Sequence, residues 1–328
     1  MKILYAIQGT GNGHVSRARE IVPLLQAHGD LDILISGTQA DVKLAQDIKY
    51  QLHGFSFIFG KKGGVHHFDT WKNMNLFRFK KDMDLLPLED YNLIINDFEP
   101  VTAWACKSRK IESVSLSHQA AFKSKKVPRP KTIDWGKLIL SHYAPTTHHV
   151  GFHFERYDKY IYTPVIRGEI RALMSQNYGH YTVYLPAISD KHLVKLLQQV
   201  PHIRWEVFSK HTKEAYAVGN VWVEPINNEK FNVSLSTCEG LFTGGGFEGP
   251  AEALFLGKKL LVAPMKFQYE QQCNAYALKQ LGIPVIWAST LNWLPQIKSF
   301  VAEAQDHQFN FPDETSDIVA KVVQDYAK

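Results

Sequence analysis

Residues 240–252 read GLFTGGGFEGPAE, in which an apolar run ends at Gly244, Gly245 and Gly246 and a helical pattern starts directly after them. Glycine lets backbone N–H groups approach an anion closely, and the positive N-terminal end of a following helix adds to the attraction. The stretch therefore predicts a strand, a phosphate-binding turn and a helix.

Polar side chains follow this turn and a second apolar run. Phe247, Glu248 and Glu252 come after the glycines, and Glu270 and Gln271 come after the next expected strand. Carboxylate and amide groups can accept from and donate to sugar hydroxyls. We therefore expect a nucleotide sugar, with its diphosphate on the glycine turn and its ribose and hexose held by these side chains.

The rest of the chain alternates short apolar runs with helical patterns, which is typical of parallel sheets covered on both faces. The 328 residues are long enough for two domains, which we place at 1–163 and 164–328, the second of them beginning with a polar linker stretch that ends at Gly179. A helix is expected at 316–326. Strands are expected at 3–7, 32–36, 56–58, 93–96, 114–117 and 149–154, and then at 181–185, 205–208, 221–223, 240–243, 260–263 and 284–286.

These residues resemble the donor-site signature of GT-B glycosyltransferases, especially the family 28 enzymes that glycosylate lipid-linked intermediates and the family 1 UDP-sugar transferases. In the family 1 signature, a glycine turn leads to a ribose-binding glutamate, here Glu252. An acidic–Gln pair that holds the donor sugar then precedes Asn274 and Ala275. The resemblance implies an α/β fold of two Rossmann-like domains that face a cleft. The first domain would bind the acceptor and the second the nucleotide sugar, and the last helix would cross back onto the first domain.

Two departures separate the chain from that signature. Gly244 replaces the family 1 histidine that contacts the phosphate, and Glu248, Gly249 and Pro250 replace the usual Asn-Ser-Thr. A carboxylate beside a diphosphate requires a cation or a sugar hydroxyl to offset its charge. We therefore expect a partner for Glu248.

A second glycine loop follows the first expected strand, with Gly11, Asn12 and Gly13 ahead of His14. A dinucleotide fingerprint would lie here, but His14 replaces its third glycine, and the second strand ends without an acidic residue for a ribose. We therefore do not expect a nicotinamide enzyme. In the transferases that the chain resembles, this loop faces the cleft, which places His14 at the acceptor hydroxyl.

An acceptor hydroxyl needs a base, and histidine exchanges a proton readily near neutral pH. Asp97, in the sequence IINDFEP, matches the position of the family 1 aspartate that supports this histidine. A single displacement by the activated hydroxyl predicts inversion at the anomeric carbon. The alternatives are a helix-capping or phosphate-contacting His14, and an Asp97 that caps the helix starting near Pro100.

Arg17 could neutralise a phosphate from the first helix or form a surface pair. Its Gly-His-x-x-Arg context also occurs in a GT-B-like hydrolase of UDP-linked bacterial sugars, in which His14 would activate water. A nucleotide-sugar hydrolase or epimerase, and a non-catalytic sugar-nucleotide-binding protein, therefore remain alternatives. His118 and Gln119 follow another strand end and could line the acceptor pocket, although a buried capping histidine is the plainer interpretation.

The first 150 residues hold 20 Lys and Arg against 14 Asp and Glu, whereas the remainder holds 17 against 18. Many of these basic residues lie at 123–131, which could meet an anionic membrane or a phosphorylated lipid carrier, or could be a solvated loop. Segment 71–81 mixes aromatic and basic residues. This pattern is consistent with a membrane-facing surface and equally with a core face whose lysines are solvated. No nucleic-acid-reading module is recognisable, so we do not expect nucleic acid. The expected partners are a nucleotide sugar and a glycan or lipid-linked acceptor.

The three cysteines are an odd number and widely spaced, which favours reduced thiols in a cytoplasmic protein, with peripheral contact to the inner membrane face as a further expectation. The chain shows neither an 18-residue apolar run nor a signal peptide. Two D-x-D triplets, at 30–32 and 82–84, and two His pairs, at 66–67 and 148–149, lack further ligands at suitable spacing. We therefore expect no metal and no cofactor, because the helix end and backbone N–H groups can stabilise the leaving diphosphate.

Overall fold

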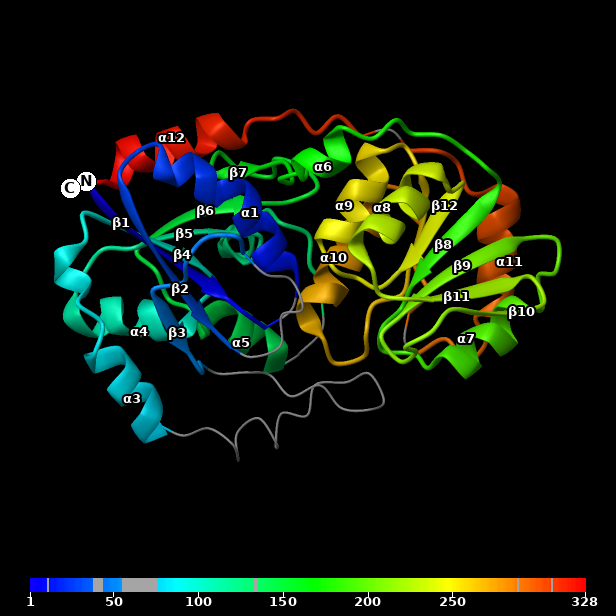
Figure 1. Ribbon diagram of the computed structural model, residues 1–328, viewed down its shortest axis with the longest axis horizontal. Helices are drawn as coiled ribbons and strands as arrows, with labels where there is room; N and C mark the ends of the chain where they lie inside the picture. The colour runs from blue at the N-terminus through cyan, green and yellow to red at the C-terminus, as the bar shows by residue number, and fades with distance from the viewer. Residues whose placement is uncertain (11, 38–43, 55–75, 132–134, 288, 308) are drawn as a thin grey trace.

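The computed structural model describes residues 1–10, 12–37, 44–54, 76–131, 135–287, 289–307 and 309–328. The chain forms two lobes that lie side by side, each built around a largely parallel sheet (Figure 1). The predicted α/β architecture of two Rossmann-like domains is confirmed. The strand expected at 56–58 lies outside the described residues.

Within the described residues, the first sheet has seven strands in the order β3-β2-β1-β4-β5-β6-β7, all parallel to their neighbours. They are β1 (Lys2–Gln8), β2 (Asp30–Ser36), β3 (Tyr50–Leu52), β4 (Leu93–Asp97), β5 (Val114–Ser117), β6 (His148–Phe152) and β7 (Ile161–Tyr162). Since β2 pairs on one side of β1 and β4 on the other, the winding of the sheet reverses between β1 and β4. In open α/β sheets, ligands bind at the carboxyl ends of the strands at such a switch point.

The helices of the first lobe are α1 (Asn12–Gln26), α3 (Leu76–Asp84), α4 (Pro100–Arg109) and α5 (Trp135–His142). Strands β1 and β4 are apolar and buried along nearly their whole length, as expected for parallel strands covered on both faces. Helix α4 is capped by Glu99, whose two carboxylate oxygens each accept a bond of 2.7 Å, from the backbone N–H groups of Val101 and Thr102. Glu99 therefore fills the capping role that was the alternative interpretation of Asp97.

The second sheet has six strands in the order β10-β11-β9-β8-β12-β13, and only the β10–β11 pair is antiparallel. They are β8 (His180–Tyr184), β9 (Arg204–Ser209), β10 (Tyr216–Val218), β11 (Val221–Pro225), β12 (Gly240–Thr243) and β13 (Lys259–Val262). This sheet also has a switch point, because β9 and β12 flank β8. The strand expected at 284–286 is reduced to a single bridge between Val262 and Val285.

The helices of the second lobe cover this sheet. They are α7 (Asp190–Leu197), α8 (Asn228–Thr237), α9 (Glu248–Phe255), α10 (Tyr269–Gln280) and α11 (Leu294–Glu303). Helix α9 starts two residues after the glycine turn, as the sequence predicts. A short helix, α6 (Gly168–Arg171), lies between the last strand of the first sheet and the first strand of the second.

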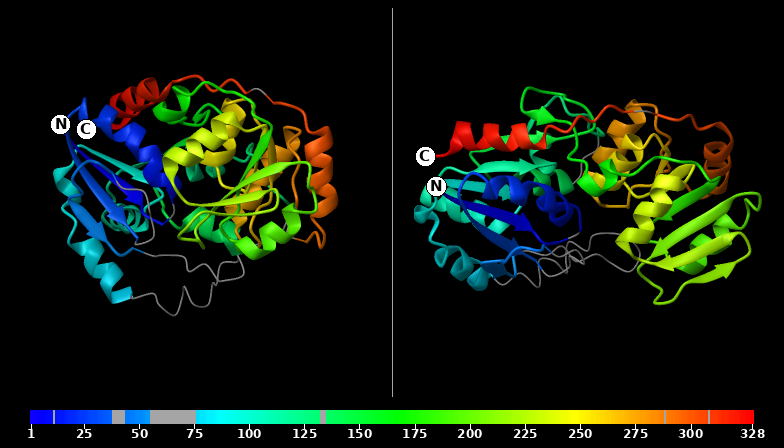
Figure 2. Two further views of the ribbon diagram at one scale, coloured as in Figure 1. Left: turned by 45° about the vertical axis from the view of Figure 1, so that its right-hand side comes forward. Right: turned by 45° about the horizontal axis from the view of Figure 1, so that its top comes forward.

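The final helix, α12 (Thr315–Tyr326), crosses back to the first lobe and packs against α1, as expected (Figure 2). The Tyr326 ring stacks on His148 with centroids 4.6 Å apart, and Lys328 N donates to the carbonyl oxygen of Asn92. The chain therefore passes between the lobes twice. The proposed boundary between residues 163 and 164 remains a prediction.

The two lobes share buried apolar contacts. One continuous cluster of buried side chains includes residues of β1, β6, α9 and α10, and the ring centroids of Phe154 and Phe247 lie 5.0 Å apart across the junction. Contact between Phe154 and Phe247 removes apolar surface of both lobes from water, so apolar burial contributes to holding the lobes together.

Candidate active site

The turn after β1 and the turn after β12 face each other across the junction. Gly13, at the start of α1, lies so close to α9 that an added Cβ would be 2.5 Å from Oε2 of Glu248. A larger residue at this position would require the Glu248 side chain to move. The sequence predicted that both loops belong to one site, and the structure brings Gly13 and Glu248 together. Gly11 lies outside the described residues, and the Asn12 side chain is likewise not described.

His14 and Asp97 meet at the carboxyl ends of β1 and β4. His14 Nδ1 lies 2.7 Å from Asp97 Oδ1, and the exposed fractions of the two side chains are 12% and 0%. The register explains the meeting, because Ile7 in β1 pairs with Asp97 in β4. With Nδ1–H donated to the aspartate, the second ring nitrogen of a neutral His14 carries the lone pair that a base requires.

Arg17 connects this pair to the other lobe. Its Nε and Nη2 atoms donate to both carboxylate oxygens of Asp97 at 2.7–3.0 Å, and its Nη1 donates to Glu248 Oε1 at 2.6 Å. Only 2% of the Arg17 side chain is exposed. The guanidinium group therefore joins Asp97 to the first residue of α9, and Glu248 has the cationic partner that was expected from the sequence.

The charges in this cluster stabilise one another. Burial alone would raise the pKa of Asp97, but the charges of Arg17 and His14 and their hydrogen bonds outweigh burial and lower the pKa. Burial likewise opposes the charged form of Arg17, whose pKa is nevertheless raised by Asp97 and Glu248. Asp97 is thus held as a carboxylate, which is the form that can stabilise a protonated His14.

Backbone strain marks the residue after Asp97. Phe98 has φ of 57°, in the left-handed region that bulky side chains rarely adopt, and its ring lies parallel to that of His14 with centroids 6.3 Å apart. The ring also packs against Tyr143, at 4.9 Å between centroids. Such strain is characteristic of functional sites, and here it fixes the chain directly beside the aspartate.

The donor-side turn is held by amide side chains. Gln271 Oε1 accepts from the backbone N–H groups of Met265 at 3.0 Å and Gly245 at 3.3 Å, and Asn274 Nδ2 donates to the carbonyl oxygen of Gly245 at 3.0 Å. A Cβ on Gly245 would lie 2.5 Å from the backbone of Gln271, whereas a Cβ on Gly246 would meet no described atom within 4 Å. The turn is therefore anchored on one side and open on the other.

Gln271 Oε1 is already used as an acceptor for two backbone N–H groups. Glu270, the residue before it, lies half-buried in the first turn of α10. Their contact with a donor sugar remains a prediction. The same holds for the phosphate contacts expected of Gly244, Gly245 and Gly246.

Glu252 lies deeper than expected for a ribose ligand. Its two carboxylate oxygens accept from Arg167 Nε at 2.6 Å and Nη2 at 2.9 Å, and only 5% of its side chain is exposed. Arg167 also donates to Asn232, Asn228 and Glu169. Glu252 is thus already part of a buried ion pair that ties α9 to the segment between the sheets, and its ribose contact remains a prediction.

His118 and Gln119 follow β5 and are both buried. His118 contacts the second lobe, since its Nε2 lies 2.8 Å from Asn274 Oδ1 and its ring stacks on Phe247. Oε1 of Gln119 has no hydrogen-bond partner among the described residues. His118 is the N-cap residue of a 3-10 helix but makes no side-chain cap bond, and its place in an acceptor pocket remains a prediction.

Among the described residues, the candidate metal motifs are not gathered into one cluster. Asp32 binds Lys49 and Tyr91, and the described residues contain no group of three or more His, Cys, Asp or Glu side chains that could hold a metal ion. His66 and His67 lie outside the described residues.

The sequence profile of glycosyl transferase family 1 matches residues 1–304. The chain belongs to this family. The search of curated proteins returned no match. As a member of the family, the chain is a glycosyltransferase. The glycine turn after β12 and the His14–Asp97 pair are the parts of it that we consider candidates for the active site.

Solved structures share its GT-B fold. MurG of Acinetobacter baumannii has a TM-score of 0.58 and 13% identity, over 98% of this chain and 99% of that one. The glycosyltransferase SnogD of Streptomyces nogalater has a TM-score of 0.51 and 14% identity, over 99% and 94%. UGT89C1 of Arabidopsis thaliana, solved with UDP, has a TM-score of 0.53 and 10% identity, over 99% and 94%. At these identities the similarity establishes the fold alone.

Three features of the site were not predicted from the sequence. Arg167 carries no motif, and its pairing with Glu252 depends on the path between the sheets. The stack of His118 on Phe247 joins residues 129 positions apart, and the positive φ of Phe98 leaves no compositional trace. The sequence shows that an aromatic residue follows Asp97, but it does not show the backbone conformation of that residue.

Proposed function

We propose that this glycosyltransferase moves a hexose-type sugar from a UDP donor to a hydroxyl acceptor with inversion at the anomeric carbon. The observation that carries the proposal is the 2.7 Å hydrogen bond between His14 and Asp97 at the switch point of the first sheet, opposite the glycine turn of the second. A histidine oriented by a buried carboxylate is the arrangement that activates a hydroxyl for attack.

In the proposed reaction, His14 Nε2 takes the proton of the acceptor hydroxyl while its Nδ1–H remains bonded to Asp97. The hydroxyl oxygen forms a bond to the anomeric carbon as the bond from that carbon to the diphosphate oxygen breaks. The electron pair leaves with UDP, and the negative charge of Asp97 stabilises the imidazolium that forms.

The donor would lie on the glycine turn. The N–H groups at the start of α9 and the guanidinium of Arg17, which contacts the first residue of α9, would stabilise the negative charge of the leaving diphosphate. The reaction we propose therefore requires no metal ion and no cofactor, and the nucleotide sugar is a substrate. Glu252, Glu270 and Gln271 would hold the ribose and the hexose.

Arg17 would change partners during the cycle. Its Nη1 donates to Glu248, while its Nε and Nη2 remain on Asp97. A diphosphate on the turn would compete with Glu248 for Nη1, which would release the Glu248 carboxylate toward a sugar hydroxyl. In this way donor binding would be coupled to the charge beside the base.

The main alternative is a nucleotide-sugar hydrolase, in which the same pair activates water. The observation that favours it is the closed junction, where an apolar cluster joins the lobes and 12% of the His14 side chain is exposed. An epimerase or a sugar-nucleotide sensor would use the same donor turn.

The acceptor would be a glycan or lipid-linked molecule, approached from an anionic membrane surface. On α3, Leu76 and Phe77 have exposed fractions of 60% and 92% and stand beside Lys80 and Lys81. The described residues contain no helix long and apolar enough to cross a membrane. The expectation is therefore a peripheral contact of an otherwise cytoplasmic protein.

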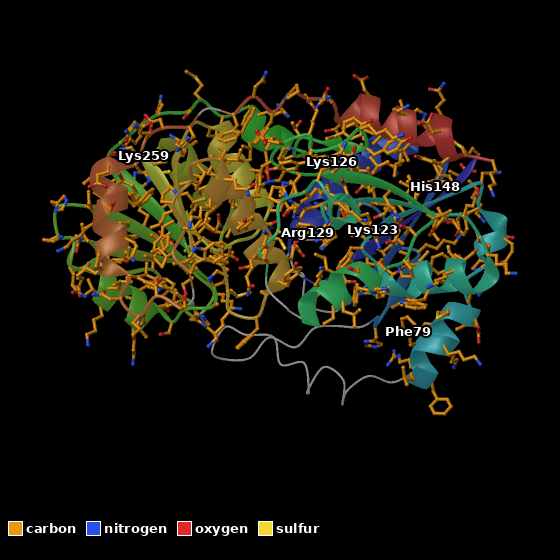
Figure 3. The ribbon with its side chains drawn as sticks, turned by 180° about the vertical axis from the view of Figure 1, so that it is seen from behind. Phe79, Lys123, Lys126, Arg129, His148 and Lys259 are labelled. Carbon is orange, nitrogen blue, oxygen red and sulfur yellow. The ribbon has the colours of Figure 1, made fainter. Side chains whose placement is uncertain are left out.

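Residues 123–131, which we call the basic loop, lie on the same lobe. Figure 3 shows Lys123, Lys126 and Arg129 on one side of the first lobe, toward the junction with the second. Lys125, Lys126 and Arg129 line an open pocket of about 400 Å³ together with Tyr276 and Gln280 of α10. Positive charge in such a pocket suits the phosphate of a lipid carrier.

The test is calorimetric titration with UDP, GDP and ADP, followed by a UDP-release assay on several UDP-sugars. We expect UDP to bind, with negligible release until a hydroxyl acceptor is added. Rapid release from one UDP-sugar without acceptor would establish the hydrolase instead. Absence of binding by any of the three nucleotides would overturn the donor assignment.

A further inference from the structure

His118 provides a contact route from the first lobe to the donor turn of the second. The residue follows β5 and is 1% exposed. Its Nδ1 lies 2.8 Å from the carbonyl oxygen of Phe152 in β6, and its Nε2 lies 2.8 Å from Oδ1 of Asn274 in α10. A neutral imidazole carries one N–H, and with this hydrogen on Nε2 the ring donates to Asn274 in the second lobe while Nδ1 lies beside the Phe152 carbonyl in the first.

Asn274 carries this contact to the glycine turn. Its Nδ2 donates to the carbonyl oxygen of Gly245 at 3.0 Å, which orients Oδ1 toward His118. Asn274 is completely buried, so neither end of its amide can exchange its partner for water without opening the junction. The path from Phe152 through His118 and Asn274 ends at the middle glycine of the turn.

The ring of His118 also touches the other side of the turn. It stacks on Phe247 with centroids 3.8 Å apart and an angle of 7° between the rings. Phe247 directly follows the three glycines and precedes α9. A single side chain of the first lobe thus contacts the residue after the turn directly and the middle of the turn through Asn274.

Space filling alone does not explain a histidine here. Burial lowers the pKa of His118, against the opposing charges of Glu270 and Glu248 and the two hydrogen bonds, so the ring is held neutral. Burying its polar nitrogen atoms carries a desolvation cost that an apolar ring does not have. An aromatic hydrocarbon would fill the same volume without that cost. What the imidazole adds is the bond to Asn274.

We propose that His118 is a positioning residue, which holds the donor glycine turn in its binding conformation only when the two lobes are closed. Opening the junction would separate His118 from Asn274 and Phe247 and would free the glycine turn to move. The affinity for the donor would then depend on a residue of the first lobe that does not itself contact the nucleotide. This inference rests on the proposed function, because it assigns a regulatory contact to the same donor site.

Three substitutions separate the two contacts. His118→Phe keeps a ring for Phe247 but removes the bond to Asn274, His118→Gln keeps an amide donor but removes the ring, and His118→Ala removes both. Val114→Ala, at the opposite end of β5, is the matched control for general loss of core packing. All proteins are measured as full chains.

The first readout is hydrogen exchange of the amides at 244–249 in the protein without nucleotide. We expect faster exchange in His118→Ala, intermediate exchange in His118→Phe and His118→Gln, and wild-type exchange in Val114→Ala. Exchange in His118→Ala no faster than in Val114→Ala would overturn the proposal. This readout stands even if the donor is not UDP.

The second readout is UDP affinity by calorimetry. We expect the Kd of UDP to rise about tenfold in His118→Ala, in keeping with the loss of one buried hydrogen bond and one ring contact, and less in the two single-contact variants. An unchanged Kd with faster turn exchange would also overturn the coupling. Failure of the wild type to bind UDP would contradict the proposed function and leave the exchange result to decide the role of His118.

Discussion

Arg17 Nη1 and Glu248 Oε1 lie 2.6 Å apart and join the first helix of one lobe to the first residue of α9 in the other. The same guanidinium group holds Asp97, which in turn holds His14. A proton-accepting group and the donor turn are therefore connected through one buried cation. Substitutions along this line should separate binding from chemistry.

His14→Ala should abolish turnover and spare nucleotide binding. The imidazole is the group placed to accept the acceptor proton, and loss of a general base lowers the rate by about 10²–10⁴-fold. UDP affinity, measured by calorimetry, should remain within about twofold of wild type, because His14 has no role in binding UDP in the proposed mechanism. Equal loss of UDP binding and of turnover would contradict this division of roles.

Glu248→Gln should strengthen UDP binding. The Glu248 carboxylate competes with a diphosphate for Nη1 of Arg17, so removing its charge should lower the Kd of UDP about three- to tenfold. Glu239→Gln is the control, since it removes a carboxylate of the same lobe that pairs with Lys259. Weaker UDP binding in Glu248→Gln than in Glu239→Gln would show that Glu248 supports the donor instead of competing with it.

Glu252→Ala should destabilise the fold as well as weaken UDP binding. It leaves Nε of the buried Arg167 without its acceptor and leaves Glu169 as the carboxylate partner of the guanidinium group, a change that lowers the free energy of unfolding by up to about 3–5 kcal/mol. Urea unfolding measures this loss, and Glu252→Gln, which keeps an acceptor for Arg167, should lose less. UDP binding should be compared at temperatures where both variants are folded. Wild-type stability of Glu252→Ala would mean that the ion pair is not essential to the fold.

Contact with an anionic membrane should depend on the basic loop. The double substitution Lys125→Glu, Lys126→Glu reverses charge at the open pocket beside α10. We expect the wild type to sediment with vesicles of phosphatidylglycerol and phosphatidylcholine, and the variant to remain in solution at about 0.1 M salt. Vesicles of phosphatidylcholine alone are the control. Equal sedimentation of both proteins with the anionic vesicles would remove the loop from the proposed acceptor surface.

The sequence predicted those parts of the site that follow from local pattern. The expected strand ends bring His14 and Asp97 together and put the glycine turn directly after β12, because parallel strands deliver their carboxyl ends to one edge of a sheet. The roles of these residues in the reaction remain predictions. Contacts between the lobes were beyond such reasoning. The bond from His118 to Asn274 and the ion pair of Arg167 with Glu252 depend on how two separately folded sheets meet, and no spacing along the chain encodes that arrangement.

Stability should fall as the pH is lowered from about 6.5 to about 4. Burial lowers the pKa of His118, His153 and His180, and lowers that of His149 to about 4, whereas unfolded histidines titrate near 6.5. In this window the unfolded chain binds more protons than the folded one, so the free energy of unfolding rises with pH and is lost on acidification. The lowered pKa of Asp97 acts in the same direction only below about pH 4.

Thermal unfolding at pH 7.5, 6 and 5 should show a falling Tm. His153→Phe should flatten the fall, because it removes one buried histidine whose pKa is lowered. Nε2 of His153 has no hydrogen-bond partner among the described residues, so phenylalanine breaks no bond at that atom. A Tm that is constant over this range, or a wild-type slope in His153→Phe, would show that the buried histidines do not govern acid stability.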